Sequence, residues 1–220
     1  MPRKNAKRDV YSSLDALKER HPRWKHYNLR IFDLRAPITV VAPHGGYIEA
    51  GTSYLAQRVA GSDCNLFDFQ GLLKTKPNRL HVTSVNFHDP LLQELLQRSR
   101  LAVSIHSMGV EGAGEIWVGG LNRELRQAVA EELQKVGFTV RTDMPKYRGE
   151  HRRNFVNTAA EHGVQIEISG DVLDSFYACS KADFALHPSD SEATSRLESF
   201  VRACRKALKL SDGAVSCRHR

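Results

Sequence analysis

Two histidines and two glutamates are the strongest candidates for catalysis or metal binding. They lie in, or close to the ends of, short apolar runs of strand length. His44 and His106 each follow such a run. Glu49 comes just before a predicted helix, and Glu167 lies inside a third run. An ionised side chain is costly to bury in a strand unless it is paired or bound to a metal. Histidine and carboxylate side chains are also the ligands of catalytic zinc, which takes about three of them and keeps one position open for water.

The spacing assigns a role to each of the four residues. His44 and Glu49 are five residues apart across two glycines, and glycines let a chain turn sharply enough for both side chains to reach one ion. His106 is the third ligand, from a neighbouring strand. Glu167 is then left free to act as the catalytic general base toward a zinc-activated water.

Each residue also has an ordinary structural explanation. A lone histidine near the end of a strand often makes only a hydrogen bond, and two consecutive glycines often form a plain turn. Glu167 has candidate ion-pair partners in Arg141 and Arg153. The residues by themselves therefore leave two alternatives open, a zinc site and a set of structural contacts.

Strand-like and helix-like segments that alternate along the chain must position these side chains. Strands are predicted at 38–42, 65–69, 80–84, 101–105, 115–118, 138–141 and 164–168. Helices are predicted at 52–60, 90–98, 122–136, 154–160 and 189–210. The alternation predicts an α/β fold, a single domain with a mixed, mostly parallel sheet and helices on both faces. In such a sheet the ligand site lies beyond the carboxyl ends of the strands.

The net charge of +7 is concentrated at the ends of the chain. Residues 1–8 carry +4 and residues 201–220 carry +5, so residues 9–200 carry only −2. Nucleic acid is therefore a disfavoured partner, and no helix-turn-helix, zinc-finger or RNP-type motif is present.

Length and composition set the remaining expectations. The 220 residues suit one domain, placed at 27–210, between a basic N-terminal arm at 1–26 that is partly helical or disordered and a C-terminal tail at 211–220. No apolar stretch of about 18 residues occurs, so no membrane partner is expected. The lack of a signal peptide predicts a cytoplasmic protein, with release on cell lysis as the alternative. The cysteines form no CxxC pair, which argues against a thiolate zinc site. We expect a monomer.

The residues around His44 resemble those of a known family. The segment Val41-Ala-Pro-His-Gly-Gly-Tyr-Ile-Glu-Ala-Gly-Thr-Ser53 is similar to the metal-binding signature of the bacteriophage-associated poly-γ-glutamate hydrolases. The resemblance spans residues 27–210, and further matches follow in the family's order: Leu80-His-Val-Thr-Ser84, Phe87, Pro90, Ser104-Ile-His-Ser107, Val118-Gly-Gly-Leu121, Asn154, Asn157 and Gly163-Val-Gln-Ile-Glu-Ile-Ser169.

The resemblance implies a core similar to that of the zinc carboxypeptidases. It implies that Zn2+ is held by His44, Glu49 and His106, with Glu167 activating water. It also implies a polyanionic substrate, poly-γ-glutamate, which is cleaved at its γ-glutamyl amide bonds. Binding such a polymer calls for basic groups, because arginine can grip a carboxylate with two hydrogen bonds. The candidate substrate-binding residues, two of which end a polar loop predicted at 142–153, are Tyr47, Arg152, Arg153 and Asn154.

Two departures from the family pattern keep other functions open. Tyr47 stands where many relatives have glycine, and the acidic segment 170–174 stands where they often have a basic residue. The first alternative is therefore a zinc amidohydrolase or carboxypeptidase that acts on a small acidic amide, such as an acylated amino acid or a peptide end. The second alternative is a non-enzymatic, basic nucleic-acid-binding accessory protein, which only the net charge supports.

Overall fold

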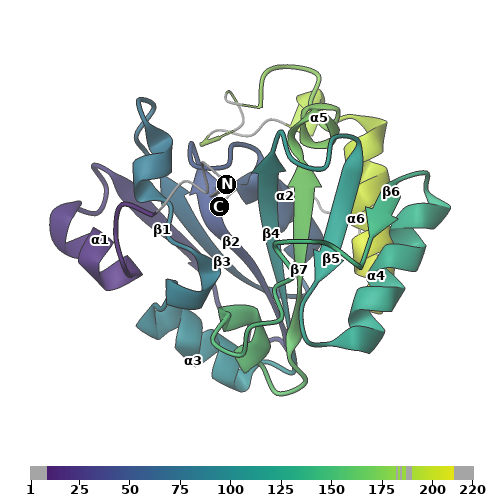
Figure 1. Ribbon diagram of the computed structural model, residues 1–220, viewed down its shortest axis with the longest axis horizontal. Helices are drawn as coiled ribbons and strands as arrows, with labels where there is room; N and C mark the ends of the chain where they lie inside the picture. The colour runs from purple at the N-terminus through teal and green to yellow at the C-terminus, as the bar shows by residue number, and fades with distance from the viewer. Residues whose placement is uncertain (1–8, 182, 184, 187–189, 211–220) are drawn as a thin grey trace, which may run out of the picture.

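The strands form one mixed sheet (Figure 1). The computed structural model describes residues 9–181, 183, 185–186 and 190–210. In these ranges the sheet has seven strands in the order β1-β3-β2-β4-β7-β5-β6. The strands are β1 (Tyr27–Phe32), β2 (Ile38–Gly46), β3 (Asn65–Gly71), β4 (Leu101–Gly109), β5 (Glu115–Gly119), β6 (Thr139–Arg141) and β7 (Gly163–Ser169).

Most neighbouring strands run parallel. β2 is parallel with both β3 and β4, β4 with β7, and β5 with β6. Among the described strands, only the pairs β1–β3 and β5–β7 are antiparallel. The predicted α/β class with a mixed, mostly parallel sheet is confirmed. Because β2, β4 and β7 are adjacent and parallel, their carboxyl ends lie at one edge of the sheet.

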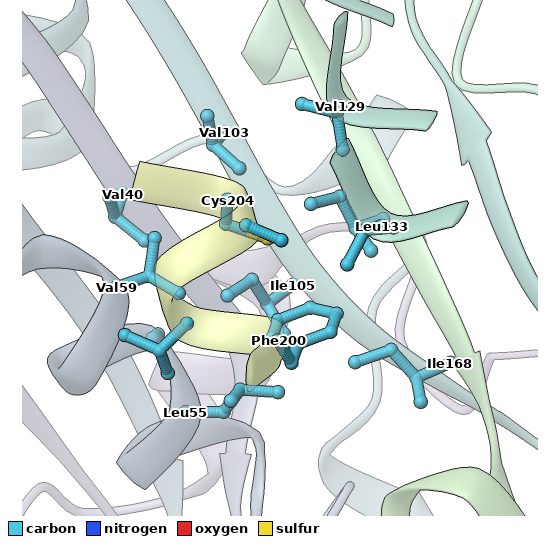
Figure 2. Packing of buried hydrophobic residues seen from close by; sticks show 14 of the residues in the cluster. Val40, Leu55, Val59, Val103, Ile105, Val129, Leu133, Ile168, Phe200 and Cys204 are labelled. Carbon is cyan, nitrogen blue, oxygen red and sulfur yellow. The ribbon is translucent and has the colours of Figure 1, made fainter. Parts of the chain in front are cut away.

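Helices cover both faces of the sheet, as predicted. Side chains of α2, α4 and α6 pack on one face with Val40 and Val103 (Figure 2), and side chains of α1, α3 and η3 pack on the other with Val41 and Ala102. The side chains of successive residues in one strand thus point to opposite faces of the sheet. The residues on both faces are apolar because the central strands are buried on both sides. The helices and 3-10 turns are α1 (Leu14–Arg20), α2 (Thr52–Ala60), η1 (Pro77–Leu80), η2 (Ser84–Asn86), α3 (Pro90–Arg98), α4 (Arg123–Lys135), η3 (Phe155–Thr158), α5 (Gly170–Asp174), η4 (Asp190–Glu192) and α6 (Ser195–Ala207).

Polar caps in the sequence decide where several helices begin. The side chains of Asp89, Asn122 and Thr194 each accept a hydrogen bond from a backbone N–H in the first turn of α3, α4 and α6, respectively. The helix predicted at 189–210 therefore begins only at Ser195, where the cap supplied by Thr194 satisfies its first turn.

The segment 80–84, predicted as a strand, is not one. Leu80 ends η1 and Ser84 begins η2. Leu80 and Val82 are buried, which produces the alternation of a strand. The backbone has a different partner, because the carbonyl oxygen of Val82 accepts a hydrogen bond from His44. The prediction was wrong because alternating burial does not specify a neighbouring strand to pair with.

α1 lies inside the predicted N-terminal arm and packs against the sheet. Ser13 caps it, and Leu14 and Leu17 are fully buried in the hydrophobic cluster that also contains α3. Residues 1–8 of the arm and the tail at 211–220 lie outside the described residues, and the predicted domain boundaries stay predictions. No helix in the described ranges is long and apolar enough to cross a membrane.

Candidate metal centre

The end of β2 is bent so that His44 and Glu49 face the same point. Its pairing with β3 shifts register after Ala42, in a bulge of the kind that re-aims side chains. Gly46 follows with a φ of +63°, and a Cβ there would lie 2.3 Å from the carbonyl oxygen of Gly71. The N–H of Glu49 then donates to the carbonyl oxygen of His44 over 2.8 Å, which closes the turn.

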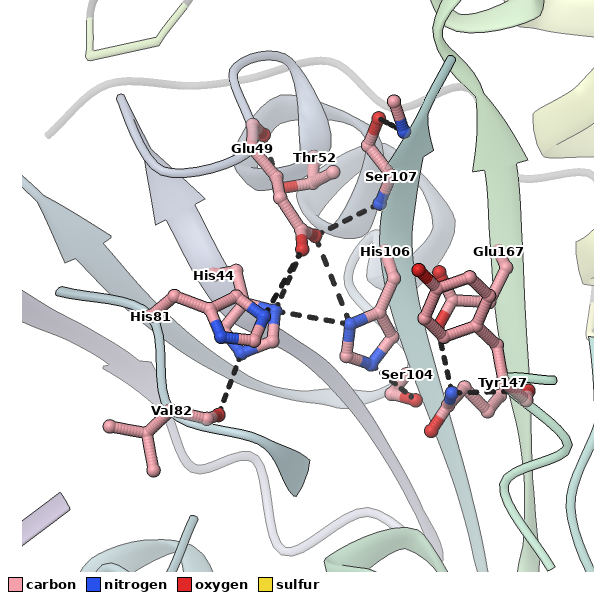
Figure 3. A network of polar contacts seen from close by, with 12 residues as sticks. His44, Glu49, Thr52, His81, Val82, Ser104, His106, Ser107, Tyr147 and Glu167 are labelled. Carbon is pink, nitrogen blue, oxygen red and sulfur yellow. Dashed lines mark hydrogen bonds and ion pairs between the residues drawn. The ribbon is translucent and has the colours of Figure 1, made fainter. Parts of the chain in front are cut away.

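His106 joins this pair from β4, the neighbouring strand (Figure 3). His44 Nδ1 lies 2.9 Å from Glu49 Oε1. His106 Nδ1 lies 3.2 Å from His44 Nδ1 and 3.8 Å from Glu49 Oε2. One ligand atom from each of the three residues lies within 4.8 Å of the others. The structure thus brings the three predicted metal ligands together, while their role as ligands stays a prediction.

Hydrogen bonds hold the far sides of both imidazole rings. Nε2 of His44 donates to the carbonyl oxygen of Val82 over 2.9 Å, and Nε2 of His106 lies 3.2 Å from Ser104 Oγ. In a ring that carries its proton on Nε2 alone, as metal binding requires, the lone pair of Nδ1 points toward the gap between the rings. Histidine ligands of metals are usually oriented in this way by a partner on the second nitrogen. Without a metal, His44 also carries a proton on Nδ1, which it donates to Glu49 Oε1. The donor set, two imidazoles and a carboxylate, fits a divalent metal ion such as zinc.

Burial and mutual contact set the charges of these three residues. Burial acts to raise the pKa of Glu49, but the charge and hydrogen bond of His44 outweigh it and lower the pKa to about 2. The pKa of His44 is raised by the same contact, against the effect of burial. Burial lowers the pKa of His106 to about 3. His106 is therefore uncharged at neutral pH, which is the form of imidazole that binds a metal.

Glu167 lies beside this group on β7, paired in register with His106 of β4. Its side chain is buried, and Gln165 Nε2 donates to its Oε1 over 2.7 Å. Burial, followed by the charge of Glu49, raises the pKa of Glu167 well above that of an ordinary glutamate. Two carboxylates that repel each other in a buried site favour a cation close to both.

Asn154, a predicted substrate-binding residue, lies behind Glu167. Its Nδ2 donates to Oε1 of Gln165 over 2.8 Å, and Gln165 in turn contacts Glu167. Both amide side chains are buried. Sequence reasoning missed Gln165, although it precedes Glu167 by two residues and therefore points to the same face of the strand. A polar residue two positions from a predicted catalytic residue is the signal that finds it.

Two tyrosines border the cluster. Tyr47, also predicted to bind substrate, lies half-buried in the turn between His44 and Glu49, with Lys74 Nζ 5.6 Å from its ring centre. Tyr147 lies in the predicted loop at 142–153, and its ring is drawn beside Glu167 in Figure 3. The φ of Tyr147 is +56°, which is rare for a bulky residue and typical of constrained functional segments. The sequence pattern did not select Tyr147 as a site residue.

Arg152 contacts a part of the molecule near the other end of β7. Arg152 lines a pocket of about 370 Å³ together with Leu121, Asn157 and His162. His162 directly precedes the amino end of β7, and Glu167 lies five residues further along the strand. At the usual rise per residue of a β-strand, that separation is about 16 Å. Arg153 is exposed on the same loop. The structure thus places Arg152 toward the amino end of β7, and the role of both arginines in substrate binding stays a prediction.

His81 is a further polar neighbour of the predicted ligands. Its ring centre lies 4.0 Å from that of His44 with an interplanar angle of 31°, and its Nε2 lies 4.0 Å from Glu49 Oε1. Asp9 Oδ1 lies 2.7 Å from the other ring nitrogen, Nδ1. The orientation of His81 therefore depends on a residue that is distant in the sequence.

Two proteins of Bacillus subtilis (strain 168) are similar to this chain in sequence. The SPβ prophage-derived protein YoqZ is 32% identical over 164 residues, which are 73% of this chain and 59% of YoqZ. YndL is 30% identical over 165 residues, which are 73% of this chain and 64% of YndL. The chain thus spans less than two thirds of the length of these two relatives.

Two solved structures share the fold over most of the chain. A bacteriophage poly-γ-glutamate hydrolase superposes with a TM-score of 0.84 at 29% identity, covering 92% of this chain and 97% of that one. A zinc-free apo form of YndL superposes with a TM-score of 0.82 at 27% identity, covering 92% of this chain and 98% of that one. The family model for poly-γ-glutamate hydrolase matches residues 11–203. The chain therefore belongs to the poly-γ-glutamate hydrolase family.

Proposed function

We propose that this protein is a zinc-dependent amide hydrolase that cleaves the γ-glutamyl bonds of poly-γ-glutamate. The observation that carries the proposal is the convergence of His44, Glu49 and His106 on one point. Glu167 lies beside them in register with His106. Family membership supports the substrate class. The description of one YndL structure as zinc-free supports zinc as the metal.

Glu167 is the residue that moves protons in this proposal. Zinc bound at the three ligands supplies Lewis acidity, which lowers the pKa of water and polarises a carbonyl group. Glu167 accepts a proton from the attacking water and passes it to the nitrogen of the leaving amine. Burial raises the pKa of Glu167 above that of an ordinary glutamate, which favours its holding the accepted proton until the amine takes it. Gln165 holds Oε1 of Glu167, so Oε2 is the oxygen assigned to the proton.

The chain segment that follows β3 suits a polyanionic substrate. Between Asp68 and Asp89 the chain has no acidic residue but carries Lys74, Lys76 and Arg79, all of them exposed. Because β3 and β2 are parallel, this segment begins at the same edge of the sheet as the predicted ligands. Cations along that edge attract the free carboxylates of a polymer whose scissile bond lies at the metal centre. In this proposal Arg152, near the amino end of β7, contacts only distant units of a long chain.

A small acidic amide is the second candidate substrate, favoured by the opposite charge beyond β7. The short helix α5 begins at the carboxyl end of β7, with Asp171 in its first turn. Asp171 Oδ2 accepts a hydrogen bond from the N–H of Gly114 over 2.8 Å, which fixes the carboxylate in place. Negative charge here opposes a polyanion that extends in this direction. It therefore favours a substrate that ends near the metal centre.

Metal content and polymer cleavage test the proposal together. The native protein and His44→Ala are analysed for bound metal, and both are assayed on poly-γ-glutamate with and without a chelator. We expect about one zinc ion per native chain and much less in the variant, because the site has only three protein ligands. Cleavage should be abolished by the chelator and restored by added zinc.

The other outcomes discriminate among the candidates. Zinc binding without polymer cleavage, together with hydrolysis of N-acylated glutamate, would reassign the protein as a small-substrate amidohydrolase. A native protein that holds no zinc after purification and none after reconstitution would contradict the proposal as a whole.

A further inference from the structure

A fully buried carboxylate lies beneath the turn that carries His44 and Glu49. Asp68, on β3, is 0% exposed. Its partner across the sheet is Arg30 of β1, whose Nη2 lies 3.1 Å from Asp68 Oδ2. A charge taken out of water in this way is costly and is held only by good partners. The proton transfers assigned to Glu167 do not involve Asp68, so the carboxylate needs another explanation.

Ser53 connects this carboxylate to the backbone of the turn. Its Oγ donates to Asp68 Oδ1 over 2.8 Å and accepts the N–H of Gly46 over 2.9 Å. Because the hydroxyl proton is directed at the carboxylate, a lone pair of the same oxygen is directed at the amide. Ser53 and Asp68 are both buried, so water does not compete for these bonds.

Gly45 leaves the space that these two side chains occupy. A Cβ on Gly45 would lie 2.1 Å from Ser53 Oγ and 2.2 Å from Asp68 Oδ1, far inside van der Waals contact. The hydroxyl and the carboxylate therefore lie flat against the backbone between His44 and Gly46. They hold the bulge of β2 from two other elements, α2 and β3, at the point where it turns toward the ligands.

We infer that Ser53 and Asp68 are positioning residues for the metal ligands His44 and Glu49. Their contacts fix the backbone between the two ligands, so that the spacing of the ligand atoms matches one ion. The inference rests on the proposed zinc site and adds a source of zinc affinity outside the ligands themselves. Partners that orient metal ligands typically contribute about tenfold to a hundredfold in affinity.

Two substitutions test the inference through the zinc Kd, measured by competition with a chromogenic chelator. Ser53→Ala deletes the connection, and its zinc Kd should rise about tenfold to a hundredfold. Asp68→Asn keeps the size and an acceptor oxygen but removes the charge that directs the hydroxyl, so its Kd should rise by a smaller factor. The double variant should bind zinc no more weakly than Ser53→Ala, because both residues act through the same contact.

Ser99→Ala is the matched control. Ser99 is a buried hydroxyl at the opposite end of the sheet, 2.7 Å from Thr39 Oγ1. Its loss should lower the Tm of the metal-free protein and leave the zinc Kd unchanged. Circular dichroism and the Tm of each metal-free variant separate a loss of fold from a loss of positioning.

The outcomes separate this inference from the proposed function. An unchanged zinc Kd in both Ser53→Ala and Asp68→Asn would overturn the inference and leave the zinc site standing. A Kd raised as much in Ser99→Ala as in Ser53→Ala would also overturn it, because a general loosening of the fold would then explain both. A native protein that bound no zinc would overturn the inference together with the proposed function.

Discussion

The two ends of the sheet bury polar groups in opposite ways. At the amino end, Thr39 Oγ1 lies 2.7 Å from Ser99 Oγ, and Asn65 Nδ2 donates to Thr39 Oγ1 over 3.1 Å. Asn65 Oδ1 accepts two backbone N–H groups from the connection between β1 and β2. Every member of this group is neutral, and each bond has a donor and an acceptor from the protein. The network is complete without a ligand.

The carboxyl end is crowded with charge instead. The Nδ1 atoms of His44 and His106 face each other at 3.2 Å, and the charge of Glu49 helps to raise the pKa of Glu167. Burial disfavours the charged forms of His106 and Glu167, whereas the contact between His44 and Glu49 favours the charged form of each. Burial of polar groups alone therefore does not mark a site. The mark is a buried group of possible metal ligands whose pKa values are shifted far from their ordinary ones by burial and by one another.

Glu167→Gln, at the carboxyl end of the sheet, should have the largest effect of these substitutions, on the catalytic rate. We expect kcat on poly-γ-glutamate to fall by a factor of about 10² to 10⁴, the usual contribution of a general acid–base group. Zinc content should stay that of the native protein, because Glu167 is not among the three predicted ligands. Steady-state kinetics and elemental analysis of the same preparation measure both. A near-normal kcat would show that another group moves the proton.

Asp68 should make the stability of the carboxyl end depend on pH. Burial raises the pKa of Asp68 to about 6 from its ordinary value of 3.8. The folded protein then keeps a proton that the unfolded chain has released, so this contribution to the free energy of unfolding falls as the pH rises between these two values. The full change corresponds to about 3 kcal/mol.

Urea unfolding of the metal-free protein at a series of pH values measures this change. The native protein should lose about 3 kcal/mol relative to Asp68→Asn between roughly pH 4 and pH 6, because the asparagine does not titrate. A difference that stays constant over that range would mean that the carboxyl group is not desolvated as its contacts imply.

Thr39→Val, at the amino end of the sheet, should have the smallest effect. It tests whether the polar network there affects stability without affecting the carboxyl end. The substitution leaves Asn65 and Ser99 each without one partner, and we expect it to lower the free energy of unfolding by about 1 to 2 kcal/mol. The cost should not vary between about pH 4 and pH 7, since none of these groups titrates there. Urea unfolding measures the cost, and kcat and zinc Kd should match those of the native protein. A kcat that fell further than the folded fraction would reveal coupling between the two ends.

The fold could be predicted where the signals act over a few residues. Asp89 and Asn122 begin their helices at the expected positions because a cap bonds within its own first turn. β-Branched and apolar runs became strands for a similarly local reason. The strand predicted at 80–84 was wrong because alternating apolar residues indicate alternating burial, whereas a strand also requires a partner for its backbone.

The site could be predicted only in part. His44 and Glu49 are close in the sequence, and His106 follows another strand, so residue type and spacing suggested one site but left plain structural contacts as an alternative. The family resemblance favoured the site, and the structure shows that the three side chains meet. Arg152 was expected to bind substrate because of its charge and its place in the loop, and that role stays a prediction, because charge does not specify where a loop runs. The contact between Ser53 and Asp68 depends on the space left by a glycine in a third segment, a relation that exists only in the folded chain.

Because of the hydrogen bond from His44 to Val82, the site depends on the length of the segment between β3 and α3 more than on the residue type at position 82. The acceptor is a main-chain oxygen, so every residue that fits at position 82 preserves it. Position 82 can therefore change its residue type, within what its buried site accepts, while His44 keeps this hydrogen bond. Insertion or deletion of one residue there displaces the carbonyl and removes the support at once. The spacing between β3 and α3 is thus as much a part of the candidate metal centre as the three predicted ligands are.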